Sequence, residues 1–174
     1  MIKLNDLQKV RGIIAFFMVA LVVSGVTAFP IETELNLLCS LFKIDSETVK
    51  TMPDIFGFLY STKESITEMN NQAPQLAYGY DWLAFAHLVI ALIFIGPFRD
   101  PIRNKWVIQW GILACVGILP LAFTCGIIRE IPLYWRFIDC SFGVFGVIPL
   151  LLCLKYIGRM EKEVAQGKAE LSEP

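Results

Sequence analysis

The sequence predicts an all-α membrane protein, a four-helix bundle whose outer face is capped by short amphipathic helices. Hydrophobic residues make up 56% of the chain and charged residues only 18%, and the mean hydropathy is +0.60. Soluble domains are about 45–50% apolar and about 25% charged, so this composition indicates a protein of the bilayer. Four long apolar stretches carry the excess, at residues 12–29, 82–98, 106–128 and 137–157.

Each apolar stretch has the length of a membrane span. A hydrocarbon core about 30 Å thick requires roughly 20 helical residues at a rise of about 1.5 Å per residue. The first stretch follows Lys3, Lys9 and Arg11, a layout that signal peptides share. Cleavage after Ala28 would place Pro30 just beyond the cut, so we expect this stretch to remain as the first span.

The distribution of Lys and Arg predicts which side each connection occupies. Three segments that must share one side are basic: the N-terminal flank, the link at residues 99–105 with three basic groups, and the tail at 158–174. The segment 30–81 on the opposite side has three lysines against eight acidic side chains. Because short cytoplasmic segments are enriched in Lys and Arg, both termini are predicted to be cytoplasmic and segment 30–81 periplasmic. The tail is polar, and we expect its helix to end near residue 157 and fray.

Segment 30–81 is too long for a simple connection. Apolar residues recur at helical spacing, which favours short amphipathic helices on the outer membrane surface; they are Leu35, Leu38, Leu41, Phe42, Ile55, Phe58 and Leu59. Ser46 is predicted to cap one such helix and Pro53 to open another. Phe56, Phe58 and Tyr60 favour a packed cap over a disordered loop.

Small and kinking residues interrupt the later spans. Pro120 and Pro149 should bend the third and fourth spans, because each removes a backbone donor. Gly143 and Gly146 are three residues apart and share a helix face. Small residues let helices approach closely in lipid, so this face is predicted to contact another helix.

A set of polar and ionisable residues is predicted to lie in the outer leaflet. Counting about 1.5 Å per residue inward from each span's outer end places His87 and Asp139 in that leaflet. The candidate ligand-binding residues are His87, Asp139, Tyr80, Asp81, Arg129, Glu130 and Arg136. Ionisable groups inside a span are costly and are functional-site candidates by default. We expect His87 and Asp139 to face the bundle interior in one layer, where Asp139 pairs either with His87 or with Arg136.

The sequence contains no motif for metal, cofactor or nucleic-acid binding. The five cysteines form no C-x-x-C motif and there is one histidine, so no metal site and no haem or other cofactor is predicted. The cysteines are expected to be small buried hydrophobes. The near-neutral net charge of -1 shows no clustered basic face, and no nucleic-acid partner is expected.

Three stretches carry a family resemblance: YGYDWLAFAH at 78–87, GPFRDPIRNKW at 96–106 and RFIDCSFGVFG at 136–146. They resemble a family of uncharacterised bacterial integral membrane proteins with no assigned activity. The resemblance implies a bacterial inner membrane and a four-helix bundle, and it implies nothing about chemistry.

The polar layer supports one main functional hypothesis and two alternatives. The main one is a small membrane protein whose outer-leaflet polar pocket binds a small or lipidic ligand, anchored by His87 and Asp139. The first alternative is an accessory subunit, with a homo-oligomer or membrane partner, in which the same polar groups only hold helices together. The second is a membrane enzyme, such as an isomerase or a quinone-linked redox partner.

Overall fold

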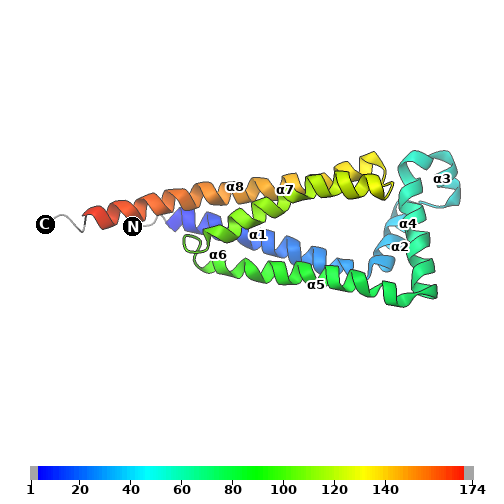
Figure 1. The fold of residues 1–174 in the computed structure, drawn as a ribbon, viewed down its shortest axis with the longest axis horizontal. Helices are drawn as coiled ribbons and strands as arrows, with labels where there is room; N and C mark the ends of the chain where they lie inside the picture. The colour runs from blue at the N-terminus through cyan, green and yellow to red at the C-terminus, as the bar shows by residue number, and fades with distance from the viewer. Residues whose placement is uncertain (1–3, 171–174) are drawn as a thin grey trace. The chain divides into compact units, whose positions relative to one another are not determined.

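The computed structural model describes residues 4–170, and these residues contain helices and no strand. Figure 1 labels the elements in chain order. They are α1 (Leu4–Ala28), α2 (Ile31–Leu41), α3 (Ser46–Thr51), α4 (Pro53–Gln72), the 3₁₀ turn η1 (Pro74–Leu76), α5 (Tyr78–Ile93), α6 (Ile95–Arg99), α7 (Lys105–Ile128) and α8 (Leu133–Glu170). The prediction of an all-α chain is confirmed. Lys3 and the last four residues of the predicted tail lie outside the described residues.

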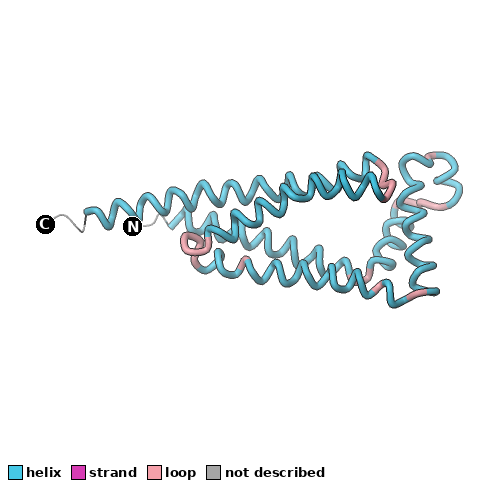
Figure 2. The backbone as a smooth tube through the Cα atoms, viewed as in Figure 1, coloured by secondary structure: helices cyan, strands magenta, loops and turns pink. Residues whose placement is uncertain are grey.

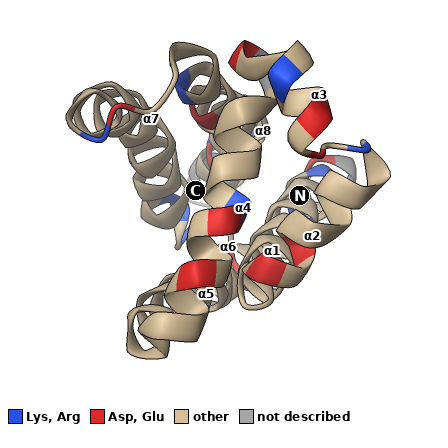
Figure 3. Ribbon diagram, turned by 90° about the vertical axis from the view of Figure 1, so that its right-hand side faces the viewer, with Lys and Arg blue, Asp and Glu red and all other residues tan. Residues whose placement is uncertain are grey.

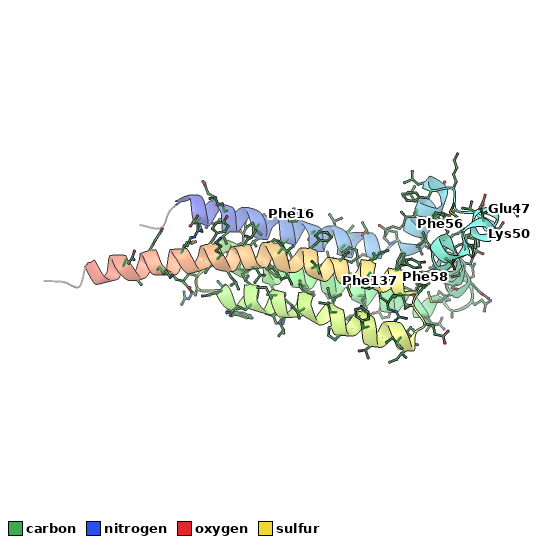
Figure 4. All side chains as sticks on the ribbon, turned by 90° about the horizontal axis from the view of Figure 1, so that it is seen from above. Phe16, Glu47, Lys50, Phe56, Phe58 and Phe137 are labelled. Atoms are coloured by element: carbon green, nitrogen blue, oxygen red, sulfur yellow. The ribbon has the colours of Figure 1, made fainter. Side chains whose placement is uncertain are left out.

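Four helical segments are long and apolar enough to cross a membrane: Asp6–Ala28, Pro74–Arg99, Lys105–Ile128 and Leu133–Gly167. Their large apolar side chains are widely exposed, with Phe16 on α1 at 69% and Phe137 on α8 at 58% (Figure 4). Soluble proteins rarely expose contiguous apolar surface on this scale. The four predicted spans therefore correspond to four apolar helical segments.

Two compact units divide the chain. One contains residues 21–90, and the other contains the described residues before and after that range. The division falls inside α1 and inside α5, so each of these helices contributes to both units. Each unit is described separately below.

The unit that contains α7 and α8 is built on close contact between these two helices, which run side by side in Figure 1. A Cβ built on Gly143 would lie 2.6 Å from the carbonyl oxygen of Cys115, and one on Gly146 would lie 2.7 Å from the Cys115 Sγ. Only glycine permits this approach, and the prediction that Gly143 and Gly146 face another helix is confirmed. Fully buried Phe94 and Leu150 extend the core.

The first half of α1 packs against α8 in the same unit. The Cys153 thiol lies 4.0 Å from the carbonyl oxygen of Val10, and both residues are fully buried. One turn away, the Asp6 carboxylate is buried, and it lies 4.0 Å from the Lys9 ammonium and 3.9 Å from the guanidinium of Arg159. A pair of Arg11 hydrogen bonds satisfies the last carbonyls of α6, a favourable position for a cation at a helix C-terminus.

The unit that contains residues 21–90 joins the second half of α1 to α5 and packs α2 on α4. A Cβ on Gly25 of α1 would lie 2.8 Å from the Ala84 carbonyl oxygen and 3.0 Å from the Cβ of His87. Glu32 on α2 accepts hydrogen bonds from Thr67 at 2.9 Å and from Asn70 at 2.6 Å, both on α4. Figure 3 colours the Lys and Arg residues of these helices blue and their Asp and Glu residues red.

Local capping explains where the short helices begin. Asp45 rather than Ser46 caps α3, because its carboxylate accepts a hydrogen bond of 2.7 Å from the backbone N–H of Thr48. The prediction for Ser46 is therefore wrong by one residue. Pro53 opens α4 as predicted, since its missing N–H and fixed φ suit the first helical turn. On the solvent side of α3, Lys50 pairs with Glu47 (Figure 4).

The helices that contain two of the predicted spans extend beyond them. The helix of the predicted second span begins at Tyr78, before residue 82, and it breaks at Phe94 into α5 and α6 (Figure 2). The fourth helix does not end near residue 157, because α8 continues without interruption to Glu170. Polar residues can continue a helix into water when no Gly–Pro signal stops it, so the end of the apolar stretch was not the end of the helix.

Candidate functional sites

The seven candidate residues divide between the two units. Tyr80, Asp81 and His87 belong to the unit of residues 21–90, whereas Arg129, Glu130, Arg136 and Asp139 belong to the unit of α7 and α8. The pairing of His87 with Asp139 in one layer spans both units and stays a prediction. The residues within each unit form separate sites.

The turn between α7 and α8 fixes two of these residues structurally. Glu130 has a left-handed backbone with φ of 54°. Its neighbour Ile131 donates from the backbone N–H to the carbonyl of Gly126 at 2.8 Å, which is the pattern that closes many helix C-termini. Arg136 folds over Gly126 and donates from Nε to the carbonyl oxygen of Ile131 at 2.7 Å. The predicted pairing of Arg136 with Asp139 is not found.

Arg129 and Asp139 share a cavity of about 250 Å³ between α7 and α8. The remaining lining is apolar or small: Ile118, Leu121, Ala122, Cys125, Gly126 and Ile131. Asp139 is half-buried, and no described side chain forms a hydrogen bond or ion pair with it. We call this cavity the α7–α8 groove.

The α7 wall of the groove follows helical spacing. Ile118, Leu121, Ala122 and Cys125 lie at i, i+3, i+4 and i+7, so they form one continuous stripe about 10 Å long. The groove therefore has an elongated apolar wall and two ionisable groups of opposite charge. This arrangement suits an amphipathic molecule better than a fully polar one.

A second cavity, of about 210 Å³, contains the other predicted pair, Tyr80 and Asp81. It lies where the turn after α1 meets α2, α4 and α5, and its further lining is Phe29, Pro30, Ile31, Glu32, Thr33, Asn70 and Ala77. The hydrogen bonds from Asn70 and Thr67 hold the pKa of Glu32 below its ordinary value. Glu32 is thus a fixed anion in this cavity at neutral pH.

An aromatic groove of about 250 Å³ adjoins the second cavity through Asp81 and Phe29, which line both. Its other walls are Tyr78, Trp82 and Phe85 on α5. The Tyr78 and Trp82 rings are 5.8 Å apart at 81°, and the Trp82 and Phe85 rings are 6.4 Å apart at 87°. Consecutive rings are therefore nearly perpendicular.

His87 lines none of these three cavities. Its Nδ1 lies 2.8 Å from the carbonyl oxygen of Leu83, one turn earlier on α5. A carbonyl can only accept, so Nδ1 carries a proton and donates a hydrogen bond to Leu83. The backbone of α1 lies against this face at Gly25, where an added Cβ would lie 3.0 Å from the Cβ of His87, so a helix contact occupies the space beside His87.

Among the described residues, no group of three or more His, Cys, Asp or Glu side chains gathers in one place. All five cysteines are free, and four of them are buried. The exposed one, Cys125, lines the α7–α8 groove.

Sequence reasoning missed Glu32, Asn70 and the apolar stripe of α7. Counting depth from the outer ends of the second and fourth spans singled out His87 and Asp139, with Asp81 at the outer end of the second span. The same count at the end of the first span would have placed Glu32 beside them. Asn70 carries no such signal, because only the fold of α4 onto α2 brings it to the cavity.

Comparison with known proteins gives no match to a family model, to a curated protein or to a solved structure. Function is therefore inferred from the geometry of the sites.

Proposed function

We propose that this chain is a multi-pass protein of a bacterial inner membrane that binds a small amphipathic, lipid-like molecule in the α7–α8 groove. In this proposal the four apolar segments form a four-helix bundle with both termini in the cytoplasm. Helices α2, α3 and α4 cap its periplasmic face. The groove then opens in the outer leaflet, because the turn at Arg129 and Glu130 connects two spans on that side.

The topology is supported by charge. Basic residues dominate the three segments assigned to the cytoplasm, and acidic residues dominate the segment assigned to the periplasm. Fusions of alkaline phosphatase and of a fluorescent protein to the C-terminus test this assignment. The fluorescent fusion should be active and the phosphatase fusion inactive, and an active phosphatase fusion would contradict the proposed orientation.

One observation carries the binding function: Asp139 is an ionisable group in an apolar span, in a cavity, without a protein partner among the described side chains. Such a group costs a few kcal/mol unless water or a ligand satisfies it. Arg129 supplies five donors at the same cavity, and Asp139 supplies acceptors. A head group that carries hydroxyls can accept from Arg129 and donate to Asp139.

The apolar stripe of α7 accommodates the rest of such a molecule. The stripe covers seven helical steps of about 1.5 Å each and is therefore about 10 Å long. This length matches roughly eight methylene groups of an extended chain, at about 1.3 Å each. The ligand class is therefore a single-chain or double-chain amphiphile whose hydroxyl head group lies at Arg129 and Asp139.

Photolabelling with a monoacylglycerol that carries a diazirine in its chain tests this function. The full chain in maltoside micelles should be labelled within residues 118–125, as mapped by peptide mass spectrometry. Asp139→Asn and Arg129→Gln should each lower this labelling several-fold. Asp54→Asn, on exposed residue Asp54 of α4, is the matched control and should leave it unchanged.

A variant that obstructs the groove separates binding from charge. Ala122→Trp fills the stripe without altering either ionisable group, and it should abolish the labelling of residues 118–125. Labelling that is spread evenly over all four apolar segments, and that is equal in every variant, would show that the probe only samples the surrounding micelle. That result would refute the groove as a binding site.

A further inference from the structure

We propose that the aromatic groove on α5 binds an alkylammonium group, held over the rings of Tyr78 and Trp82 and neutralised by Asp81. This site goes beyond the proposed function, since it shares no residue with the α7–α8 groove. All of its residues belong to one unit of the structure, the one that contains residues 21–90.

Four aromatic side chains line the groove. Along Tyr78, Trp82 and Phe85, consecutive rings meet edge to face at nearly right angles, so neighbouring ring faces point in different directions. The face of an aromatic ring is electron-rich and attracts a cation within about 6 Å of its centroid. Trp is the strongest of these acceptors, and Trp82 is central in this row.

The charge at the groove selects the class of ligand. Asp81 lines the wall of the groove, and none of the described side chains pairs with it in an ion pair or hydrogen bond. Glu32, ionised and held by α4, lines the adjoining cavity beyond Asp81. Two carboxylates behind an aromatic surface favour a cation and disfavour a phosphate or a carboxylate ligand.

Exposure shows that the groove is accessible. Trp82 is 58% exposed and Tyr78 60% exposed, so their faces do not serve to fill a core. Trp and Tyr also concentrate at membrane interfaces as amphipathic anchors, but an anchor of this kind requires no carboxylate among its rings. A quaternary ammonium group uses both features, because it is large, weakly hydrated and positively charged.

The test compares a cation with its uncharged twin. Calorimetry measures the binding of choline and of its neutral isostere to the full chain in maltoside micelles. In the isostere, a carbon atom replaces the nitrogen of the trimethylammonium group. Dodecyltrimethylammonium, added below its micellar concentration, tests the same group on a lipid-like chain. We expect saturable binding of the cations and about tenfold weaker binding of the isostere.

Variants assign the binding to this groove. Trp82→Leu and Asp81→Asn should each weaken cation binding about tenfold, while Trp106→Leu, at another exposed tryptophan on α7, should leave it unchanged. Helical content measured by circular dichroism verifies folding, and Tyr78→Leu replaces Trp82→Leu if that variant loses helix. Binding of the long-chain cation alone identifies a lipid head group, and binding of both identifies a soluble ligand.

Two results would overturn the proposal. One is equal affinity for choline and its neutral isostere, which would mean that the groove only retains apolar groups. The other is cation binding that survives all the variants of Asp81, Trp82 and Tyr78. Because the α7–α8 groove is tested with a different probe and different variants, either result leaves the proposed function standing.

Discussion

Replacement of Gly143 by Ala is the most direct test of how α7 and α8 are held together. A methyl group at this position would lie 2.6 Å from the carbonyl oxygen of Cys115. Carbon–oxygen contacts between helices are normally at least about 3.3 Å, so the two helices must separate locally by about 0.7 Å. The obstructing atom belongs to the backbone of α7 and cannot rotate away, as the end of a side chain could.

Two opposing effects determine the size of the change. Overpacking of a well-packed contact costs about 1–3 kcal/mol. Alanine is also a better helix former than glycine by about 1 kcal/mol, which offsets part of that cost. Gly158 on the same helix has no heavy atom within 4 Å of the position that an added methyl group would occupy, so Gly158→Ala reports the propensity effect alone. The difference between the two variants isolates the helix contact at about 1–3 kcal/mol.

The free energy of unfolding is measured by titrating sodium dodecyl sulfate into maltoside micelles and following helical circular dichroism. We expect Gly158→Ala to be at least as stable as the parent protein and Gly143→Ala to be less stable than Gly158→Ala. A difference below about 0.5 kcal/mol, the usual range of surface substitutions, would refute the close approach at Cys115.

Three further changes test other contacts by the same unfolding measurement or by hydrogen exchange. Gly25→Val should be about 1–3 kcal/mol less stable to unfolding than Gly12→Val. The reason is that a side chain at residue 25 meets the backbone oxygen of Ala84, whereas one at residue 12 has no heavy atom within 4 Å. Equal stability of the two variants would contradict the α1–α5 contact. The protection of α2 and α4 amides against hydrogen exchange, corrected for the intrinsic exchange rate at each pH, should decrease as the pH falls below about 4.5, the ordinary pKa of a carboxyl such as that of Glu32. Because the pKa of Glu32 is lower in the folded state, its contribution to stability is present above the unfolded-state pKa and is lost as the pH falls through the folded-state pKa. Glu32→Gln should remove this pH dependence. A pH dependence that persists in this variant would exclude Glu32 as its source. Asp6→Asn should lower the free energy of unfolding by less than about 1 kcal/mol, and by less still in high salt. The reason is that the ion pairs of Asp6 are long and their cationic partners are about half exposed. A larger loss that does not depend on salt would mean that other contacts stabilise the Asp6 carboxylate.

The apolar helices were predictable because membrane spans follow from length and composition alone. The inward face of Gly143 and Gly146 was also predictable, since helical spacing places them together and lipid gives small residues no other advantage. The continuation of α8 was not, because hydropathy marks the edge of the bilayer and carries no signal for the end of a helix. Alternating acidic and basic residues after residue 158 are compatible with either outcome.

Several residues of the cavities were predictable as residue types, but their contacts were not. Spacing placed Arg136 within reach of Asp139, yet the α7–α8 turn presents the carbonyl of Ile131 to the guanidinium instead. Rotamers and turn geometry decide such competitions, and neither follows from sequence spacing. The hydrogen bonds of Glu32 to α4 likewise depend on how two short helices pack, which no local pattern specifies.

The length of α8 has a mechanical consequence. Its 38 residues form a rod about 57 Å long, of which a bilayer core covers about 30 Å. Residues 158–170, about 20 Å of helix, extend past the apolar region as a lever continuous with the wall of the α7–α8 groove. A tilt of about 10° within the membrane would sweep the far end through about 3.5 Å. The wall of the groove and the polar end of α8 thus belong to one helix, and Pro149 lies between them as the one interior proline of α8.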